Sequence, residues 1–246
     1  MAQRVNRLPP ARVSPRSALR TPAQHAPRLR LAPNEPAPAP LSISERVKTA
    51  ADCALAAAIL VPALPLILLS VALVRLSSRG PAIYTQARVG RGGKVFTLYK
   101  IRTMYHDCER LTGPTWCKPG DARITPVGRV LRKLHLDELP QLFNVLKGEM
   151  SLVGPRPERP EIVKRLREAV VGYDRRHAVK PGITGFAQIH LPPDSCIRSV
   201  RNKLVYDLFY VRFRSWRMEL YILFATGLKM FGLKRLYYRA PRVPTE

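Results

Sequence analysis

The chain has 246 residues and a formal net charge of +25 at pH 7. The length allows one sizeable domain with a tail, and the charge favours anionic partners such as nucleic acid, phosphorylated small molecules or an acidic membrane surface. Its 4 cysteines show neither CxxC spacing nor the density of a disulfide-rich secreted domain. We therefore expect free thiols in a reducing compartment and no structural zinc site.

The N-terminal stretch, residues 1–43, is predicted to be a disordered basic tail. Its first 40 residues contain nine prolines and seven arginines but a single acid, Glu35. Such a composition cannot bury enough apolar surface to offset the ordering entropy, and the stretch lacks the continuous apolar segment of a secretory signal. Two roles stay open: a solvated tail, or a basic arm that contacts anionic lipid headgroups.

A run of 22 residues without a charge, residues 53–74, is the strongest physical signal in the chain. As one helix it would be about 33 Å long, enough for a bilayer core of about 30 Å. Pro62 and Pro65 lie at its centre, and the flanks on both sides are basic. Proline interrupts a helix, and basic flanks mark the cytoplasmic side. We therefore favour a re-entrant membrane helix hairpin, broken at Pro62, over a single span or a buried core helix.

Beyond the apolar run the pattern is that of an α+β protein that is mostly helical. Residues 82–85 and 94–99 flank a glycine-rich turn and predict a small β-hairpin. Helical periodicity follows in five segments: 103–112, 125–135, 140–147, 157–171 and 199–213. Residues 217–236 are apolar but interrupted by lysine and arginine, which indicates an amphipathic helix at a membrane interface. We assign residues 44–236 to one domain and residues 237–246 to a C-terminal tail.

Two adjacent acids, Asp137 and Glu138, stand out because they are the only carboxylates between Arg123 and Lys147. Neighbouring residues of a helix point about 100° apart, so these carboxylates cannot face each other across a substrate and should have separate tasks. Pro140 fits the first turn of a helix that runs to Lys147, which places the acidic pair at a helix N-terminus. From spacing alone, a helix-capping pair is the simpler interpretation.

A catalytic interpretation of the acidic pair needs a carboxylate that attacks phosphorus and cations that neutralise charge. One reaction of this kind forms an intermediate of the aspartyl-phosphate type. Mg²⁺ together with arginines is the usual way to let one anion approach another. The surrounding arginines suit phosphate because a guanidinium makes bidentate contacts. The pattern therefore favours a site that holds both a metal and an anionic substrate.

Four segments carry a resemblance to a known family: KIRTM at 100–104, the long block at 120–158, PGITGFAQ at 181–188 and KLVYDLFYV at 203–211. In this order the chain resembles the bacterial sugar transferases, the monotopic polyprenyl-phosphate phosphoglycosyl transferases, from about residue 44 to residue 232. The resemblance implies an enzyme of the bacterial inner (cytoplasmic) membrane with a cytosolic active site. Such an enzyme transfers a sugar phosphate from a UDP-sugar to polyprenyl (undecaprenyl) phosphate and releases UMP, which begins an exopolysaccharide, capsule, O-antigen or other glycan. The resemblance also implies a covalent phosphosugar–aspartate and Mg²⁺ as cofactor.

Matched position by position, the resemblance makes Asp137 the nucleophile and Glu138 its partner, and it leaves open which of them dominates Mg²⁺ binding. It implies substrate contacts, chiefly to phosphates, for five further residues: Arg102, Arg123, Arg132, Arg156 and Glu161. Alternatives stay open for these residues as well. The arginines could form a solvated basic face, Arg123 could make a structural ion pair with Asp121, and the role of Glu161 is undefined.

The chain departs from the family pattern in three places. Val61 stands where a serine often precedes the helix-breaking proline, which Pro62 matches, so the break would rely on Pro62 and Pro65 together. Residues 189–193, Ile-His-Leu-Pro-Pro, replace the frequent Asn-Gly-Arg and remove a cationic contact that Arg198 or Arg201 could supply. The N-terminal tail has no counterpart, and we expect the minimal, single-domain form of the family.

The expected partners are the UDP-sugar, the polyprenyl phosphate and anionic membrane lipids, while self-association and contacts with downstream glycosyltransferases stay open. The rival function is that of a basic membrane adaptor or nucleic-acid-binding protein without catalysis. No helix-turn-helix, RNP or KH pattern supports a nucleic-acid partner, and such a role would not need residues 53–74. We therefore favour the enzyme and expect no nucleic-acid partner.

Overall fold

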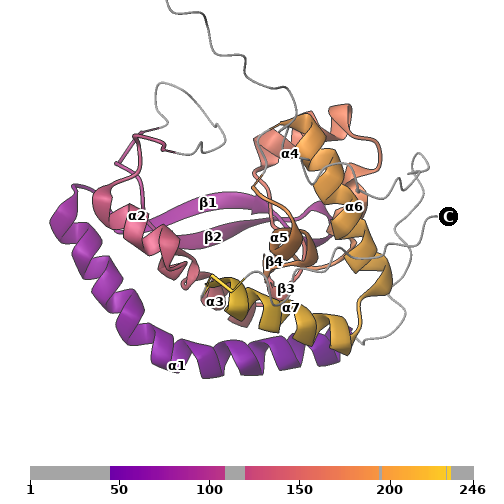
Figure 1. Cartoon of the computed structure of the whole chain (residues 1–246), viewed down its shortest axis with the longest axis horizontal. Coiled ribbons are helices and arrows are strands. Elements are labelled where there is room, and N and C mark those ends of the chain that lie inside the picture. Colours follow the sequence, from indigo (N-terminus) through magenta and orange to yellow (C-terminus); the bar gives the residue numbers. More distant parts are fainter. Residues whose placement is uncertain (1–44, 109–119, 194–195, 231, 234–246) are drawn as a thin grey trace, which may run out of the picture.

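The computed structural model describes residues 45–108, 120–193, 196–230 and 232–233. The predicted tails, residues 1–43 and 237–246, lie outside the described residues. The described part is mostly helical, with two small sheets and one long helix along the lower edge of the body in Figure 1. The predicted α+β class, mostly helical with a small β-hairpin, is confirmed.

The long helix α1, Glu45–Ser77, contains the whole apolar run and continues through Pro62 and Pro65. The predicted break at Pro62 is not found, because α1 stays one helix and bows, with its concave side against the body (Figure 1). Each proline removes a backbone donor and crowds the preceding turn, and bending relieves this crowding without ending the helix. The prolines therefore shape α1 rather than divide it.

Most of the apolar surface of α1 faces away from the protein. A stripe that includes Ala56, Ala63, Ile67 and Val74 is buried against the body. Large apolar side chains on the other faces are exposed: Leu55, Ile59, Val61, Leu64, Leu66, Leu68, Leu69, Leu73 and Leu76. Only 22% of the most apolar 18-residue window is buried, although the helix is long and apolar enough to cross a membrane. A core helix would be mostly buried, so that alternative is disfavoured.

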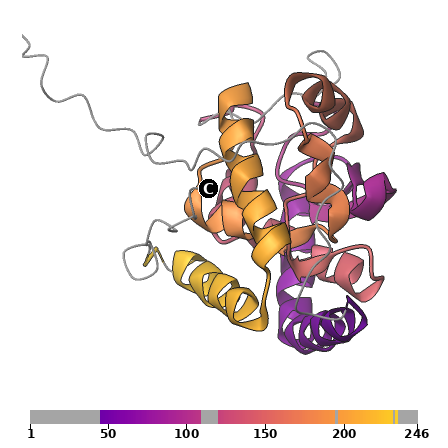
Figure 2. The same cartoon turned by 90° about the vertical axis from the view of Figure 1, so that its right-hand side faces the viewer.

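A buried polar cluster fastens the first turns of α1 to the helix α7, Trp216–Met230. Lys48 lies 3.3 Å from Asp52 and 2.8 Å from Glu219 of α7. Ser151 donates to Asp52 at 2.7 Å, and Tyr210 donates to Glu219 at 2.6 Å. These charges are shielded from water, so each needs its partners to remain buried. Figure 2 shows α1 and α7 on the same side of the molecule.

Two small sheets support the site. The strands β1, Ile83–Val89, and β2, Val95–Ile101, pair antiparallel, as predicted from the glycine-rich turn between them. The strands β3, Ser151–Val153, and β4, Gly182–Thr184, pair in parallel and were not predicted, because three residues are too few for a recognisable alternation. The helix predicted at 103–112 is wrong for the described residues 103–108, which form turns and a bridge between Met104 and Ile124.

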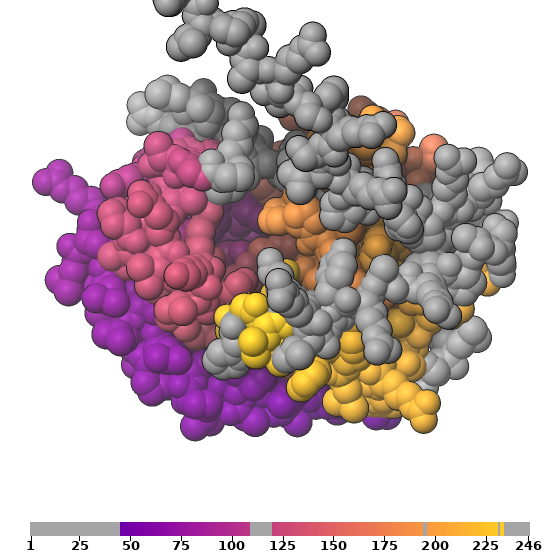
Figure 3. All heavy atoms as spheres, viewed as in Figure 1, coloured from indigo at the N-terminus to yellow at the C-terminus, as the bar shows by residue number. Residues whose placement is uncertain are grey.

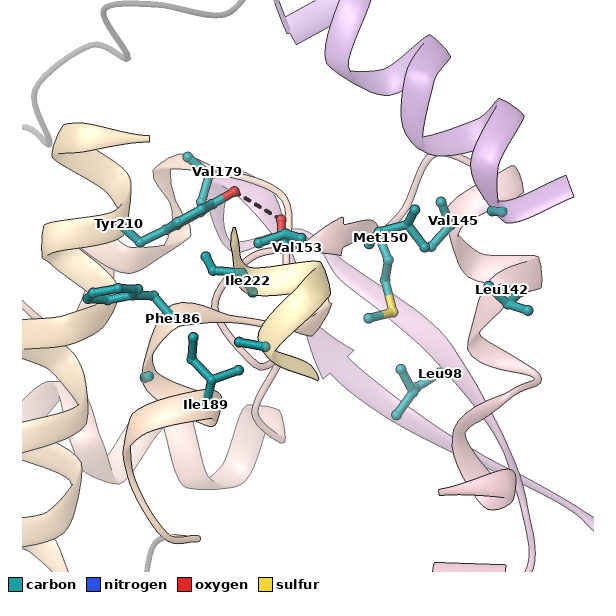
Figure 4. Packing of buried hydrophobic residues seen from close by; sticks show 14 of the residues in the cluster. Leu98, Leu142, Val145, Met150, Val153, Val179, Phe186, Ile189, Tyr210 and Ile222 are labelled. Atoms are coloured by element: carbon teal, nitrogen blue, oxygen red, sulfur yellow. Dashed lines mark hydrogen bonds between the residues drawn. The ribbon is translucent and has the colours of Figure 1, made fainter. Parts of the chain in front are cut away.

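Four further helices follow the predicted segments closely: α2 Pro126–Lys133, α3 Gln141–Leu146, α4 Pro160–Ala169 and α6 Ile197–Phe213. The short helix α5, Phe186–His190, was not predicted. Two 3₁₀ helices join them, η3 Leu136–Glu138 and η4 Tyr173–Ala178. Figure 4 shows the core between these elements, where Leu98, Val145, Met150 and Ile222 pack together with Tyr210. The Tyr210 hydroxyl, which donates to Glu219, also lies 3.0 Å from the Val153 carbonyl, so that α6 and β3 are in contact there.

Candidate active site

The acidic pair lies in η3, the short 3₁₀ turn between α2 and α3. The helix α2 begins at a Thr125 cap, whose hydroxyl accepts a bond from the Gly128 amide at 2.9 Å. It ends before His135, whose φ of +56° is unusual for a residue other than glycine and redirects the chain into η3. Pro140 is the N-cap of α3, one position from where we predicted it. The pair therefore stands just before a helix start, as expected.

Glu138 is held by two cations that come from distant segments. The Lys100 ammonium of β2 lies 2.7 Å from one carboxylate oxygen, and the Arg156 guanidinium lies 2.5 Å from the same oxygen. Burial alone would raise the pKa of Glu138, but Arg156 and Lys100 hold that pKa well below its usual range. Glu138 therefore remains an anion that is engaged in binding its two partners.

Asp137 is in the opposite situation. Its side chain is 8% exposed, and no hydrogen bond or ion pair joins its carboxylate to another residue in the described part of the chain. Burial raises the pKa of Asp137, while the positive charge of Lys100 acts against this rise. A partly desolvated carboxylate without a partner is more reactive than one that is solvated or paired. The two acids thus lie in different environments, and their separate tasks stay a prediction from the sequence.

Lys100, which pairs with Glu138, is a candidate site residue that the sequence interpretation missed, although it stands in the KIRTM segment near Arg102. Its position depends on Asn144, which is fully buried in α3. The Asn144 amide donates to the Thr97 carbonyl at 2.7 Å, and its oxygen accepts from the Tyr99 amide at 3.2 Å. These bonds fix β2 against α3 and so bring Lys100 to Glu138. No local pattern shows which of the two cations in KIRTM reaches the acids.

The structure brings Arg132 and Arg156 to the acidic pair but engages the other three candidates elsewhere. Arg132 donates to the Thr103 hydroxyl at 2.8 Å, and its charge helps to lower the pKa of Asp137. Arg102 is buried and donates to the Ser78 carbonyl and hydroxyl, both at 2.9 Å, and to the Arg79 carbonyl, where it caps the end of α1.

Arg123 and Glu161 form ion pairs of their own. Arg123 makes a bidentate pair with Asp121, with contacts of 2.9 Å and 2.7 Å, which is the structural alternative that the sequence left open. Glu161 is 58% exposed and lies 3.6 Å from Arg159. Neither geometry points to a substrate, so these two assignments rest on the resemblance alone.

The site combines a carboxylate without a partner among the described residues with three nearby cations, Lys100, Arg132 and Arg156. Figure 3 shows the face hollowed between α2 and the orange residues around α5, with part of the β1–β2 hairpin at the bottom. No group of three histidine, cysteine or acidic residues gathers as a metal cage in the described part of the chain. Mg²⁺ usually binds one or two carboxylates together with substrate phosphates. The unpaired Asp137 carboxylate fits that mode, whereas Glu138 is already occupied by Lys100 and Arg156.

Comparison with known proteins identifies the family. The family model described as bacterial sugar transferase matches residues 43–232. The chain belongs to this family. The match confirms the resemblance read from the sequence, and it includes the acidic pair, Lys100 and every candidate arginine.

The names of three relatives of this sugar transferase describe transfer of a sugar phosphate to undecaprenyl phosphate. It is 42% identical to the UDP-N-acetylgalactosamine-undecaprenyl-phosphate N-acetylgalactosaminephosphotransferase of Aeromonas hydrophila over 70% of the chain and 41% of that relative. It is 50% identical to a putative undecaprenyl-phosphate N-acetylgalactosaminyl 1-phosphate transferase of Bacillus subtilis over 46% of the chain and 63% of the relative. It is 38% identical to the UDP-glucose:undecaprenyl-phosphate glucose-1-phosphate transferase of Caulobacter vibrioides over 77% of the chain and 71% of the relative. The chain thus spans less than two thirds of the length of several relatives.

Proposed function

We propose that this sugar transferase moves a sugar phosphate from a UDP-sugar to polyprenyl phosphate and releases UMP. The names of its relatives support the reaction class, and they differ in the sugar, which is N-acetylgalactosamine in one and glucose in another. The observation that carries the proposal is the contrast within the acidic pair, where Glu138 is bound by Lys100 and Arg156 while Asp137 has no partner among the described residues. The product would be a lipid-linked sugar on which a glycan begins.

The proposed chemistry has two displacements at one phosphorus atom. An Asp137 carboxylate oxygen attacks the β-phosphorus of the UDP-sugar, the bond from that phosphorus to the bridging oxygen breaks, and UMP leaves with the bridging oxygen. A phosphate oxygen of the polyprenyl phosphate then attacks the same phosphorus, and the bond to Asp137 breaks. The carboxylate is regenerated, and the sugar phosphate is joined to the lipid phosphate.

The surrounding cations make attack by an anion on an anion feasible. Arg132 and Arg156 lie where positive charge would stabilise the phosphate oxygens, and Lys100 keeps Glu138 from repelling the substrate. If Mg²⁺ binds, the Asp137 or Glu138 carboxylate would hold it, and the ion would neutralise phosphate charge. Of the two, the unpaired Asp137 offers the better ligand in the ground state.

A membrane location is supported by the exposed apolar surface of α1 and by α7 on the same side of the molecule (Figure 2). In α7 the side chains of Trp216, Leu220 and Phe224 are exposed, which suits a helix that lies at a membrane interface. We propose that both helices contact the cytoplasmic leaflet of the inner membrane, where anionic headgroups would attract the basic flanks. The site would then open to the cytosol.

Both ends of α1 are expected to lie on one side of the membrane. At one end Lys48 pairs with Glu219, and at the other end Arg102 binds the Ser78 carbonyl. Both partners belong to the same polar body, which cannot reach across a bilayer.

This topology can be measured by labelling single cysteines in a background without native cysteines. Arg46→Cys and Arg79→Cys, at exposed positions near the two ends of α1, should react with a membrane-impermeant maleimide from the same side. Leu69→Cys, which is exposed in the middle of α1, is the matched control and should be shielded by lipid. Labelling of the two ends from opposite sides would establish a true span.

The proposed activity is tested by UMP release. Detergent-solubilised protein is incubated with Mg²⁺, polyprenyl phosphate and each member of a UDP-sugar panel. At least one UDP-sugar should yield UMP, with a stoichiometric burst in the absence of polyprenyl phosphate. A protein that shifts nucleic acid in a salt-dependent manner and releases no UMP with any sugar would support the adaptor instead.

A further inference from the structure

A buried arginine outside the site contacts the residue that binds Glu138. Arg176 lies in η4, 20 residues beyond Arg156, and only 3% of it is exposed. One terminal nitrogen donates to the Arg156 carbonyl at 2.8 Å and also lies 2.7 Å from an Asp207 carboxylate oxygen of α6. The other donates to the Tyr173 hydroxyl at 2.7 Å. The Arg176 guanidinium thus links the backbone at Arg156 to Asp207 of α6 and to Tyr173 within η4.

The turn that carries Arg156 is held at three successive carbonyls. The Pro155 carbonyl accepts from the Gly182 amide at 3.0 Å, the Arg156 carbonyl accepts from Arg176, and the Pro157 carbonyl accepts from Arg88 at 2.8 Å. The prolines on both sides of Arg156 have restricted φ angles, so they add stiffness. Because the backbone on both sides of Arg156 is held in place, the Arg156 guanidinium can reach only a small region.

We propose that Arg176 is a positioning residue, which holds the Arg156 backbone so that the Arg156 guanidinium reaches Glu138. This inference rests on the proposed function, because it assigns Arg156 a part in the transfer. Arg176 itself is almost fully buried and directs its guanidinium to Tyr173, Asp207 and a backbone carbonyl. Of the two arginines that donate to carbonyls of this turn, Arg176 is the more deeply buried, because its side chain is 2% exposed and that of Arg88 is 18% exposed.

The inference predicts that Arg176 acts through Arg156, and a double-mutant cycle measures this directly. The four proteins are wild type, Arg156→Met, Arg176→Met and the double variant, each assayed by single-turnover UMP release. Arg176→Met alone should slow release between about tenfold and 100-fold, as for a catalytic group displaced by about 1 Å. In the Arg156→Met background the same change should cost less than about twofold, because the group that Arg176 positions is already gone.

A merely structural role would give a different pattern. If Arg176 only stabilises the fold, its replacement slows release by the same factor in both backgrounds, and that additive result would overturn the proposal. No effect of Arg176→Met on wild-type protein would overturn it as well.

A second variant that removes fewer contacts tests the proposal if Arg176→Met does not fold. Tyr173→Phe removes one acceptor of Arg176 and leaves its pair with Asp207 intact. It should slow UMP release severalfold in wild type and leave the rate of Arg156→Met unchanged; equal slowing in both would contradict the proposal. The proposed function fails separately, namely if no UDP-sugar yields UMP. Full activity of Arg156→Met, by contrast, would remove Arg156 from the site and refute this inference alone.

Discussion

Asp137→Asn is expected to abolish UMP release and the trapped phosphosugar adduct, with turnover lowered at least about 10³-fold. An amide has nearly the same size as the carboxylate but cannot attack phosphorus. The measurement is UMP release with the UDP-sugar found active in the panel. Mass spectrometry of the intact protein after incubation with that UDP-sugar alone detects the adduct.

The thermal stability of the same variant separates loss of chemistry from loss of fold. Burial raises the pKa of Asp137, so its charged form is disfavoured in the folded protein at pH 7. Asparagine removes that charge and breaks no hydrogen bond among the described residues, so the unfolding temperature measured in EDTA should rise. Glu168→Gln, an exposed acid of α4, is the matched control and should change neither quantity. An adduct on the Asp137→Asn protein would show that the nucleophile is assigned wrongly.

Glu138→Gln is expected to have the opposite effect on stability. The change leaves Lys100 and Arg156 without their shared carboxylate, and breaking a buried ion pair costs about 3–5 kcal/mol. We expect the lower end, about 3 kcal/mol, because the Arg156 side chain is 34% exposed. At this chain length the unfolding temperature should fall by roughly 6–12 °C. Activity should fall too, because the released cations can pair with Asp137 and weaken it as a nucleophile.

A second substitution tests this explanation. Lys100→Met in the Glu138→Gln background removes one of the two unpaired cations and should restore part of the lost stability, although either change alone destabilises the protein. Glu168→Gln again serves as the exposed control. If Glu138→Gln unfolds at the wild-type temperature, the two cations do not hold the turn as the distances indicate.

Local patterns were sufficient for the elements whose signal lies within one segment. The 22 uncharged residues predicted a membrane-length helix, and the glycine-rich turn predicted the β1–β2 hairpin, because hydrophobic periodicity and turn chemistry act between near neighbours. Such patterns failed where two local tendencies compete. At Pro62 and Pro65 the proline signal predicted a break, but the 33 residues of α1 form one helix that bows instead.

The chemistry of the acidic pair was likewise predictable only in part from the local sequence. Two adjacent acids before a helix proline, surrounded by arginines, indicated separate tasks and an anionic substrate, because side-chain directions on one short turn depend only on neighbouring residues. Which acid is paired and which is available depends on Lys100, 38 residues earlier, and on Arg156, 18 residues later. Arg102 and Arg156 are both basic residues in family motifs, yet one caps α1 and the other binds Glu138. Composition and spacing cannot separate them, because contacts between distant segments arise only when the sheets, α3 and η4 pack into one core.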